Sequence, residues 1–407
     1  SGTLHFLRLQ GVNSTVIKEQ KQWEILETGK EKLTFEAHSN SVRAIAVTPD
    51  GKTAISGSWD NTIKIWDLET RKEKFTFKGH SGWVKAIAVT PDGRTLISGS
   101  DDKTVTAWDL KTGTEKFTLP NHNSWVRVLA ITPDGETMIS ASDDNTIKVW
   151  DLKAGTEKFT LSGHSDLVSV LAITPDGETM ISASDDNTIK VWDLKGGTEK
   201  FTLSGHSDLV SALAITSDGQ ILISASDDNT IKVWDLKGGT EKFTLSGHSR
   251  FINAITVTPD GQTLASGSRD NTIKVWDLKG GTEKFTLSGH SRWVNAIVIT
   301  PDGQTLISAS DDETVKVWDL KTRAERFTLS GHSHWVNEIA ITPDGETLFS
   351  AYEDKIKAWD LETGAEKFTL SGHSVCWVSI VAVTRNGQML IANYADDKIE
   401  EIKAWDL

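Results

Sequence analysis

Short apolar runs and short alternating runs recur along most of the chain at a regular interval. Between residues 155 and 196, VSVLAI and TMISAS are almost wholly apolar, whereas EKFTL and IKVW alternate between polar and apolar residues. Runs of this length, bounded by Pro-Asp-Gly, Asp-Asp-Asn and Lys-Gly-Gly, are typical of β-strands joined by tight turns. The pattern predicts four short strands in each interval, and no segment keeps a helical period.

The same unit is copied many times. Residues 155–196 and 197–238 differ at only five positions, and looser copies fill most of the remaining sequence. Nine units are each marked by one histidine and one tryptophan, and the spacing is 42 residues until the eighth unit. The markers are His38, His80, His122, His164, His206, His248, His290, His332 and His373, and Trp66, Trp108, Trp150, Trp192, Trp234, Trp276, Trp318, Trp359 and Trp405. This period predicts one continuous array over residues 31–407 instead of two or three separate domains. Residues 1–30 are expected to be a separate N-terminal segment, a tag remnant followed by the tail of a degenerate repeat.

Gly-His near the start of the units and Trp-Asp at their ends resemble the signature of WD40 repeats, and the similarity between copies resembles the repetitive WD40 arrays of bacteria. The resemblance implies an all-β fold, a single closed β-propeller of nine four-stranded blades. It also implies that an N-terminal strand, here Glu31–Glu36, completes the last blade, because the chain ends after the third strand of the ninth unit. The alternative is a ring closed by seven or eight blades with surplus blades outside it, which would leave strand edges exposed.

His, Ser, Asp and Trp recur at constant offsets in units one to seven. In the second and fourth units these residues are His80, Ser98, Asp102, Trp108, His164, Ser182, Asp186 and Trp192. His, Ser and Asp would also suit a hydrolase triad, but seven identical copies with a mid-strand serine argue against catalysis. The resemblance to WD40 repeats implies a structural tetrad, in which Asp holds His, His holds Ser, and Ser accepts a hydrogen bond from Trp. We expect Asp354 to serve in the eighth unit, and Asp396 or Asp397 in the ninth.

Charge and cysteine content limit the classes of partner. The net charge is −14 and Cys376 is the only cysteine. An acidic chain without a basic stripe is a poor nucleic-acid binder, and no apolar run approaches the length of a membrane span. One histidine per unit spreads the imidazoles around a ring, so we expect no metal site and no cofactor. A single cysteine favours a cytoplasmic protein.

Positions just after the marker His and just before the tetrad Asp differ most between copies. The resemblance places both on one face of the propeller, the top face, near the central opening. We predict a partner-binding surface there, with aromatic anchors beside an acidic arc and a basic arc. Its residues are Trp59, Trp83, Trp125, Phe251, Trp293, Trp335 and Trp377, then Arg250, Arg269 and Arg292, then Asp101, Asp143, Asp185 and Asp227, with Asp166 and Asp208 beside them. The alternative is that the aromatic residues only cover the inner strands and the Asp residues only form turns.

Three functions fit this pattern. The first is a non-catalytic scaffold that binds a protein or peptide with basic and apolar side chains across the top face. The second is a sensor or regulatory domain of a larger bacterial signalling or NTPase protein, which the resemblance to bacterial arrays suggests. The third is an enzyme with a site at the central opening, for which no residue that breaks the repeat supplies a nucleophile, metal cluster or carboxylate pair.

Overall fold

The computed structural model describes residues 31–40, 42–68, 70, 72–119, 122–371, 377–383, 387, 389–395 and 400–406. The expected N-terminal segment, residues 1–30, lies outside this part, as do Asp396 and Asp397. Trp377 begins a strand, but its side chain is also outside the described part. The described residues form β-strands and turns without a helix, which confirms the predicted all-β class.

The strands pair into nine four-stranded antiparallel sheets, each made of consecutive hairpins except for one that combines both ends of the chain. The first strands are β2 (Val42–Val47), β6 (Val84–Val89), β10 (Val126–Ile131), β14 (Val168–Ile173), β18 (Val210–Ile215), β22 (Ile252–Val257), β26 (Val294–Ile299), β30 (Glu338–Ile341) and β34 (Trp377–Val383). The second strands are β3 (Thr53–Ser58), β7 (Thr95–Ser100), β11 (Thr137–Ser142), β15 (Thr179–Ser184), β19 (Ile221–Ser226), β23 (Thr263–Ser268), β27 (Thr305–Ser310), β31 (Thr347–Tyr352) and β35 (Met389–Ala395).

The third strands are β4 (Thr62–Asp67), β8 (Val105–Asp109), β12 (Ile147–Asp151), β16 (Ile189–Asp193), β20 (Thr230–Asp235), β24 (Thr272–Asp277), β28 (Val315–Asp319), β32 (Lys355–Asp360) and β36 (Glu400–Asp406). The fourth strands are β5 (Lys72–Lys78), β9 (Thr114–Leu119), β13 (Thr156–Leu161), β17 (Thr198–Leu203), β21 (Thr240–Ser246), β25 (Thr282–Ser288), β29 (Ala324–Leu329), β33 (Glu366–Ser371) and β1 (Glu31–His38). We number the sheets that begin with β2 to β30 as sheets 1 to 8, and call the sheet β34–β35–β36–β1 the terminal sheet.

The predicted turn residues take the conformations that tight hairpins need. Between the second and third strands of sheet 4, Asn187 has a φ of 66°, and before the fourth strand of the same sheet, Gly197 also has a φ of 66°. These left-handed positions favour glycine and asparagine, which explains why the Asp-Asp-Asn and Lys-Gly-Gly runs recur. The four-stranded unit predicted from the sequence is confirmed.

The terminal sheet joins the two ends of the described chain. Strand β1 pairs antiparallel with β36, with Thr34 opposite Lys403 and Phe35 opposite Ile402. The strand expected at Glu31–Glu36 extends to His38. One strand therefore comes from the N-terminal side and three from the C-terminal side, so that β36 has a neighbour on both edges.

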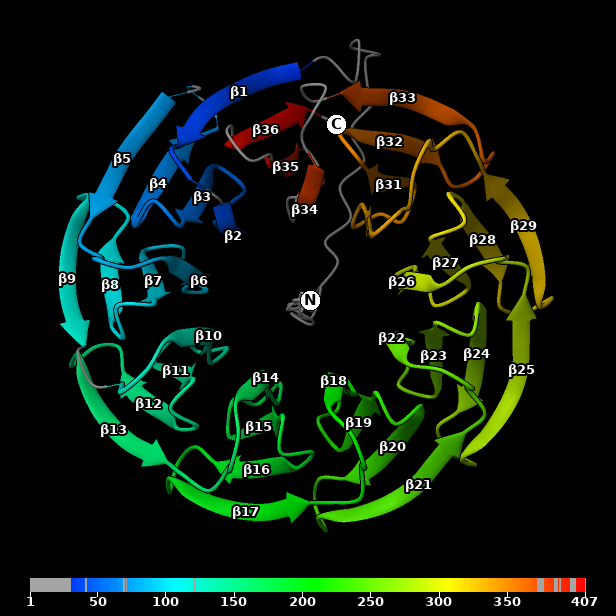
Figure 1. The fold of residues 1–407 in the computed structure, drawn as a ribbon, viewed down its shortest axis with the longest axis horizontal. Helices are drawn as coiled ribbons and strands as arrows, with labels where there is room; N and C mark the ends of the chain where they lie inside the picture. The colour runs from blue at the N-terminus through cyan, green and yellow to red at the C-terminus, as the bar shows by residue number, and fades with distance from the viewer. Residues whose placement is uncertain are drawn as a thin grey trace.

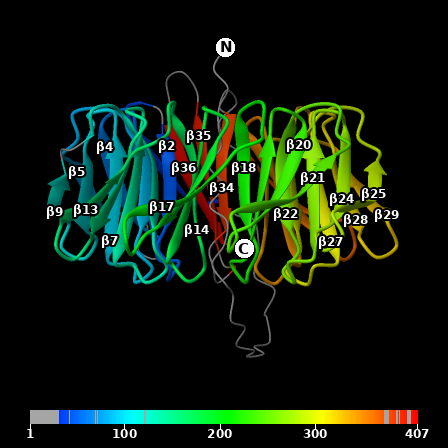
Figure 2. The same ribbon diagram turned by 90° about the horizontal axis from the view of Figure 1, so that it is seen from below.

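The sheets lie in a ring with the first strand of each on the inner side and the fourth on the outside (Figure 1). Seen from the side, the ring is a disc whose strands run between its two faces (Figure 2). The hydrophobic core is divided into clusters between neighbouring sheets. For example, Trp192 of sheet 4 packs with Ile139 and Val149 of sheet 3. The terminal sheet shares one such cluster with sheet 8 through Trp405, and another with sheet 1 through Ile391.

Candidate functional site

The four tetrad residues are joined by hydrogen bonds inside each of sheets 1 to 7. In sheet 4, His164 Nδ1 lies 2.9 Å from Asp186 Oδ2, His164 Nε2 lies 2.8 Å from Ser182 Oγ, and Trp192 Nε1 donates to Ser182 Oγ at 2.8 Å. In sheet 2 the corresponding distances among His80, Asp102, Ser98 and Trp108 are 2.9, 2.7 and 2.8 Å. The carboxylate accepts from Nδ1–H, so Nε2 is left to accept from the serine hydroxyl.

The tetrad satisfies buried polar groups instead of offering a reactive one. Ser182 is fully buried, and its oxygen already accepts the indole N–H of Trp192. Burial raises the pKa of the Asp102 carboxyl, but hydrogen bonds from His80 and Thr104 outweigh this and hold the pKa well below its usual range. Burial lowers the pKa of His164, and Asp186 raises it back only in part. At neutral pH the tetrad of sheet 4 therefore holds a neutral His164 beside an ionised Asp186, and burial closes it to substrate.

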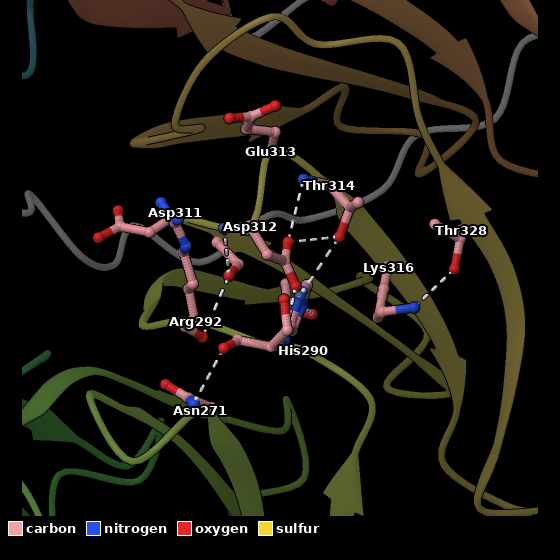
Figure 3. Close-up of polar contacts among 12 residues, drawn as sticks. Asn271, His290, Arg292, Asp311, Asp312, Glu313, Thr314, Lys316 and Thr328 are labelled. Carbon is pink, nitrogen blue, oxygen red and sulfur yellow. Dashed lines mark hydrogen bonds and ion pairs between the residues drawn. The ribbon is translucent and has the colours of Figure 1, made fainter.

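Figure 3 shows the polar network of sheet 7 around one tetrad histidine. Asp312 accepts from His290 Nδ1 at 2.8 Å through one oxygen, and from the hydroxyl and backbone N–H of Thr314 at 2.6 and 3.1 Å through the other. The carboxylate also accepts the N–H of Ser291 at 2.9 Å. Asp312 therefore ties the loop before the first strand to the turn before the third, and this fixes the two segments that carry the variable positions.

Sheet 8 departs from this arrangement, and the prediction that Asp354 replaces the tetrad Asp is wrong. His332 Nδ1 instead donates to the backbone carbonyl of Glu313 in sheet 7, at 3.2 Å. The turn is one residue shorter, so Tyr352 pairs directly with Lys355. The Tyr352 ring, at the place in the sequence where sheets 1 to 7 have serine, packs edge-on against His332 with a centroid distance of 4.7 Å. His332 still contacts Ser350 Oγ at 2.8 Å.

The top face, as defined above, brings together the two variable positions of each sheet. In sheets 2 to 7 the backbone N–H of the residue before the tetrad Asp donates to the carbonyl of the third residue after the marker His. The pairs are Asp101 and Trp83, Asp143 and Trp125, Asp185 and Leu167, Asp227 and Leu209, Arg269 and Phe251, and Asp311 and Trp293, at 2.9 to 3.0 Å. These sequence-predicted residues therefore lie next to one another.

The aromatic side chains on this face are open to solvent. Trp83 is 41% exposed, Trp125 43%, Phe251 38%, Trp293 41% and Trp335 44%. Single exposed apolar residues are common on protein surfaces, but here five large aromatic side chains are exposed at equivalent positions of different sheets. Trp59 differs, because it is only half-exposed: the Arg43 guanidinium lies 4.1 Å from its ring centroid, and it stacks on Trp83 at 4.2 Å.

Cations hold several of these rings across sheet boundaries. Lys85 Nζ of sheet 2 lies 4.2 Å from the ring centroid of Trp125 in sheet 3 and 5.9 Å from that of Trp83. On the other side of the ring of sheets, the Arg269 guanidinium lies 5.2 Å from Phe251 and 4.8 Å from Trp293 of the next sheet. Cation–π contacts of this kind restrict the rings to one orientation.

The continuous acidic arc predicted from Asp101 to Asp227 is interrupted. Asp101 forms an ion pair with Lys85 at 2.7 Å, and Asp143 forms a bidentate contact with Arg127, with Arg127 Nη2 at 2.8 Å. The fifth residue after the marker His, which supplies these cations, points toward the residue before the tetrad Asp in the same sheet. In sheets 4 and 5 the fifth residue after the marker His is Ser169 or Ser211, so this position supplies no cation to pair with an acidic side chain there.

The sequence pattern did not predict that this fifth position pairs with the residue before the tetrad Asp. The structure pairs Arg43 with Trp59, Lys85 with Asp101, Arg127 with Asp143, Asn253 with Arg269 at 3.1 Å, and Asn295 with Asp311 at 2.6 Å. The two positions change together between copies, and this joint variation was the signal that could have revealed it. The asparagines also reach the next sheet, since Asn253 donates to the carbonyl of Val294 at 3.1 Å.

The remaining predicted residues, two arginines and two aspartates, lie on the surface of the protein. Arg250 and Arg292 are exposed beside Phe251 and Trp293, and Asp166 and Asp208 are exposed beside Leu167 and Leu209. Within the described part of the chain, no three His, Cys, Asp or Glu side chains come together as metal ligands. The described residues also contain no helix long and apolar enough to cross a membrane.

A protein-family model described as WD domain, G-beta repeat matches the chain at residues 29–67, 71–109, 113–151, 155–193, 197–235, 239–277, 281–319 and 324–360. These are eight repeats, one fewer than the nine units that a His and a Trp mark in the sequence. The unmatched unit follows residue 360 and contributes the last three strands of the terminal sheet.

Two curated relatives match over short segments. The small ribosomal subunit protein RACK1 of Dictyostelium discoideum is 36% identical over 62 residues, 14% of this chain and 19% of that protein. The guanine nucleotide-binding protein subunit beta-5b of Danio rerio is 38% identical over 66 residues, 16% of this chain and 15% of that protein. The matched segment thus spans less than a fifth of either relative.

Among solved structures, the crystal structure of the computationally designed Ika8 protein is similar to this chain. Its sequence is 30% identical, the TM-score is 0.65, and the similarity covers 82% of this chain and 99% of that chain. The family model covers well over half of the sequence, and its repeats coincide with the strands and tetrads described above. The chain therefore belongs to the family of WD40-repeat proteins.

Proposed function

We propose that the protein is a non-catalytic scaffold that binds a protein or peptide across its top face. The observation that carries this proposal is the set of five exposed aromatic side chains, Trp83, Trp125, Phe251, Trp293 and Trp335, on one face. Solvent exposure of such side chains is unfavourable, and aromatic anchors beside fixed charges are typical of binding hot spots. RACK1 and the G-protein beta subunit, which share this repeat, are named as parts of a ribosomal subunit and of a nucleotide-binding protein assembly.

The charge pattern refines the chemistry of the partner. Lys85 and Arg127 offset the acidic residues of sheets 2 and 3, so apolar side chains of the partner would pack on the rings there. Sheets 4 and 5 carry exposed Asp166 and Asp208 and no aromatic residue at the third position. A basic side chain of the partner is expected over these two sheets.

The test is selection of peptides from a random display library with the wild-type protein, followed by titration of the enriched peptides. Replacing Trp293 and Trp335 by Ala should weaken binding at least about ten-fold, since a hot-spot residue contributes about 2 kcal/mol or more. Lys242→Ala, on outer strand β21, is the matched control and should bind as the wild type does. If the enriched peptides bind the double variant with unchanged affinity, the top face is not the binding site.

We also propose that residues 31–407 form one closed nine-bladed propeller, with the terminal sheet as the blade that closes it. Support comes from the pairing of β1 with β36 and from the two hydrophobic clusters of the terminal sheet. Thr34 and Lys403 face each other in this pairing, so cysteines at these positions should form a disulfide in a Cys376→Ser background. A pair placed out of register, at residues 34 and 400, is the control. Failure of the 34–403 pair to oxidise would contradict closure by this strand.

A further inference from the structure

One turn of sheet 7 differs from the same turn in sheets 2 to 6 and in sheet 8; in sheet 1 this place in the sequence is taken by Arg71, which lies outside the described residues. The residue before the fourth strand is a left-handed glycine in sheets 2 to 6 and in sheet 8, with φ between 64° and 72°. These glycines are Gly113, Gly155, Gly197, Gly239, Gly281 and Gly364. In sheet 7 the same place is taken by Arg323, with a φ of 61°. A left-handed backbone is unfavourable for arginine, and such strain is concentrated at functional sites in proteins.

The glycines are needed because each turn packs against a phenylalanine of the preceding sheet. A Cβ at Gly281 would lie 2.2 Å from Phe243, and one at Gly155 would lie 2.9 Å from Phe117. Both distances are too short for real atoms. Arg323 has a Cβ, so its turn cannot approach Phe285 of sheet 6 as closely as its counterparts do. Its guanidinium instead lies over the Phe285 ring, 5.1 Å from the centroid.

A cavity of about 400 Å³ lies at this junction, which we call the 6–7 notch. Its apolar wall includes Pro259, Phe285 and Leu320, and its cations are Lys284, Lys321 and Arg323. Phe285 and Leu320 are half-buried, whereas the three cations are exposed. The notch lies opposite the top face, because the turns that lead into the second and fourth strands are at that end of the sheet.

The cations of the notch are available to an anion. Within the described residues, the structure records no ion pair for Lys284, Lys321 or Arg323; Lys284 Nζ donates to the hydroxyl of Thr263 at 2.9 Å. Two carboxylates, Asp260 and Asp302, also line the cavity.

Each of these carboxylates is engaged by its own turn. Asp260 accepts from the hydroxyl of Thr258 at 2.5 Å and from the backbone N–H of Gln262 at 3.0 Å. Asp302 makes the same two contacts with Thr300 and Gln304. The same turn recurs in other sheets, for example at Asp176, whereas Arg323 takes a place that is glycine in sheets 2 to 6 and in sheet 8.

We propose that the 6–7 notch binds an organic phosphate monoester, with the phosphoryl group on the three cations and the apolar body against Phe285 and Leu320. A phosphoryl group carries about 1.5 to 2 negative charges and three acceptor oxygens, which suits a guanidinium fork with two ammonium groups. The cavity has the size of a small-molecule site, and it combines an apolar wall with few polar groups.

Phenyl phosphate is the probe, titrated against the full chain by ligand-observed NMR. Two variants separate charge from backbone. Arg323→Gly introduces the residue that sheets 2 to 6 and sheet 8 have at this place, so we expect it to preserve folding. Arg323→Asn keeps a side chain that tolerates a left-handed backbone but lacks the charge. Cooperative thermal unfolding of both variants, as in the wild type, controls for folding.

The expected result is that the wild type binds phenyl phosphate and that both variants bind at least about ten-fold more weakly, because a charge-assisted hydrogen bond is lost. Binding should also weaken as salt is added. Phenol, benzoate and inorganic phosphate should each bind more weakly than phenyl phosphate. The proposal is overturned if Arg323→Asn binds as tightly as the wild type, if the wild type does not bind, or if any of the three fragments matches phenyl phosphate.

Discussion

Acid should destabilise sheet 8 before the other sheets, because of the altered histidine environment there. Burial lowers the pKa of His332 from its ordinary value of 6.5 to about 4, and the hydrogen bond to the Glu313 carbonyl raises it only in part. In sheet 4 the charged carboxylate of Asp186 raises the pKa of His164 toward its ordinary value, whereas His332 has a neutral carbonyl at this place. His332 is also buried and packed edge-on against Tyr352, so a charge on its ring would be poorly solvated.

The sign and the magnitude follow from linkage. Between pH 6.5 and about pH 4 the unfolded state binds a proton at His332 and the folded state does not, so stability falls as the pH falls. The difference between 6.5 and about 4, at about 1.36 kcal/mol per pH unit, gives about 3 kcal/mol lost by pH 4. The side chain is almost fully buried, so little of this is screened by solvent. A loss of this size is a large part of the stability of one blade-sized unit.

Hydrogen exchange measured by mass spectrometry at pH 7 and pH 5, corrected for intrinsic rates, resolves individual sheets. Peptides from β30 to β33 should lose protection at pH 5 more than peptides from β14 to β17 do. His332→Gln cannot be protonated, so it should lower protection at both pH values but remove the pH dependence between them. The reasoning fails if the variant keeps the pH dependence of the wild type, or if sheets 4 and 8 respond equally to acid.

Three further changes test the structure. Ser182→Ala leaves the indole N–H of a buried tryptophan and one histidine nitrogen without their partner, so it should cost about 2 to 4 kcal/mol in urea unfolding, with the loss of exchange protection centred on sheet 4. Lys85→Met, at a cation that is 18% exposed, should cost about 2 kcal/mol, whereas Arg127→Met, at a cation that is 43% exposed, should cost less than about 1 kcal/mol. The carboxylates left behind, Asp101 and Asp143, are both 12% exposed, so equal costs would contradict the argument from burial of the cation. Arg323→Gly relieves a left-handed arginine and should raise the melting temperature slightly, by up to about 1 kcal/mol of stability; a lower melting temperature would show that the contact with Phe285 outweighs the strain.

Much of the fold could be predicted from the sequence because its determinants are local and repeated. Turn residues, strand lengths and the alternation of apolar positions are all set within one unit, and the same pattern recurs from unit to unit. The tetrad partners were also predictable, since all four residues belong to one unit. The joining of β1 to the last three strands followed from counting strands along the chain, although its partner lies at the far end of the sequence.

The features that sequence reasoning missed depend on contacts between units or on a change of register. The His332 partner is a backbone carbonyl of the neighbouring sheet, and backbone groups carry no sequence signature. The one-residue shortening near Tyr352 was visible, but its effect on the tetrad depended on the hairpin that formed. The contacts of Lys85 with Trp125, and of Arg269 with Trp293, depend on how closely adjacent sheets approach at the top face.

The pairing at the top face explains how one scaffold can vary its surface without losing stability. The residue before the tetrad Asp meets the fifth residue after the marker His, so a charge introduced at one position is satisfied at the other, as in Lys85 with Asp101. Neither position belongs to the tetrad or to the clusters between sheets, so we expect substitutions at the pair to leave the packing of the core unchanged. Sheets 4 and 5 have the same serine and aspartate at these positions and present nearly the same surface twice. Under the proposed function, discrimination between partners would come from the sheets on either side, where the pairs differ and the aromatic side chains are exposed.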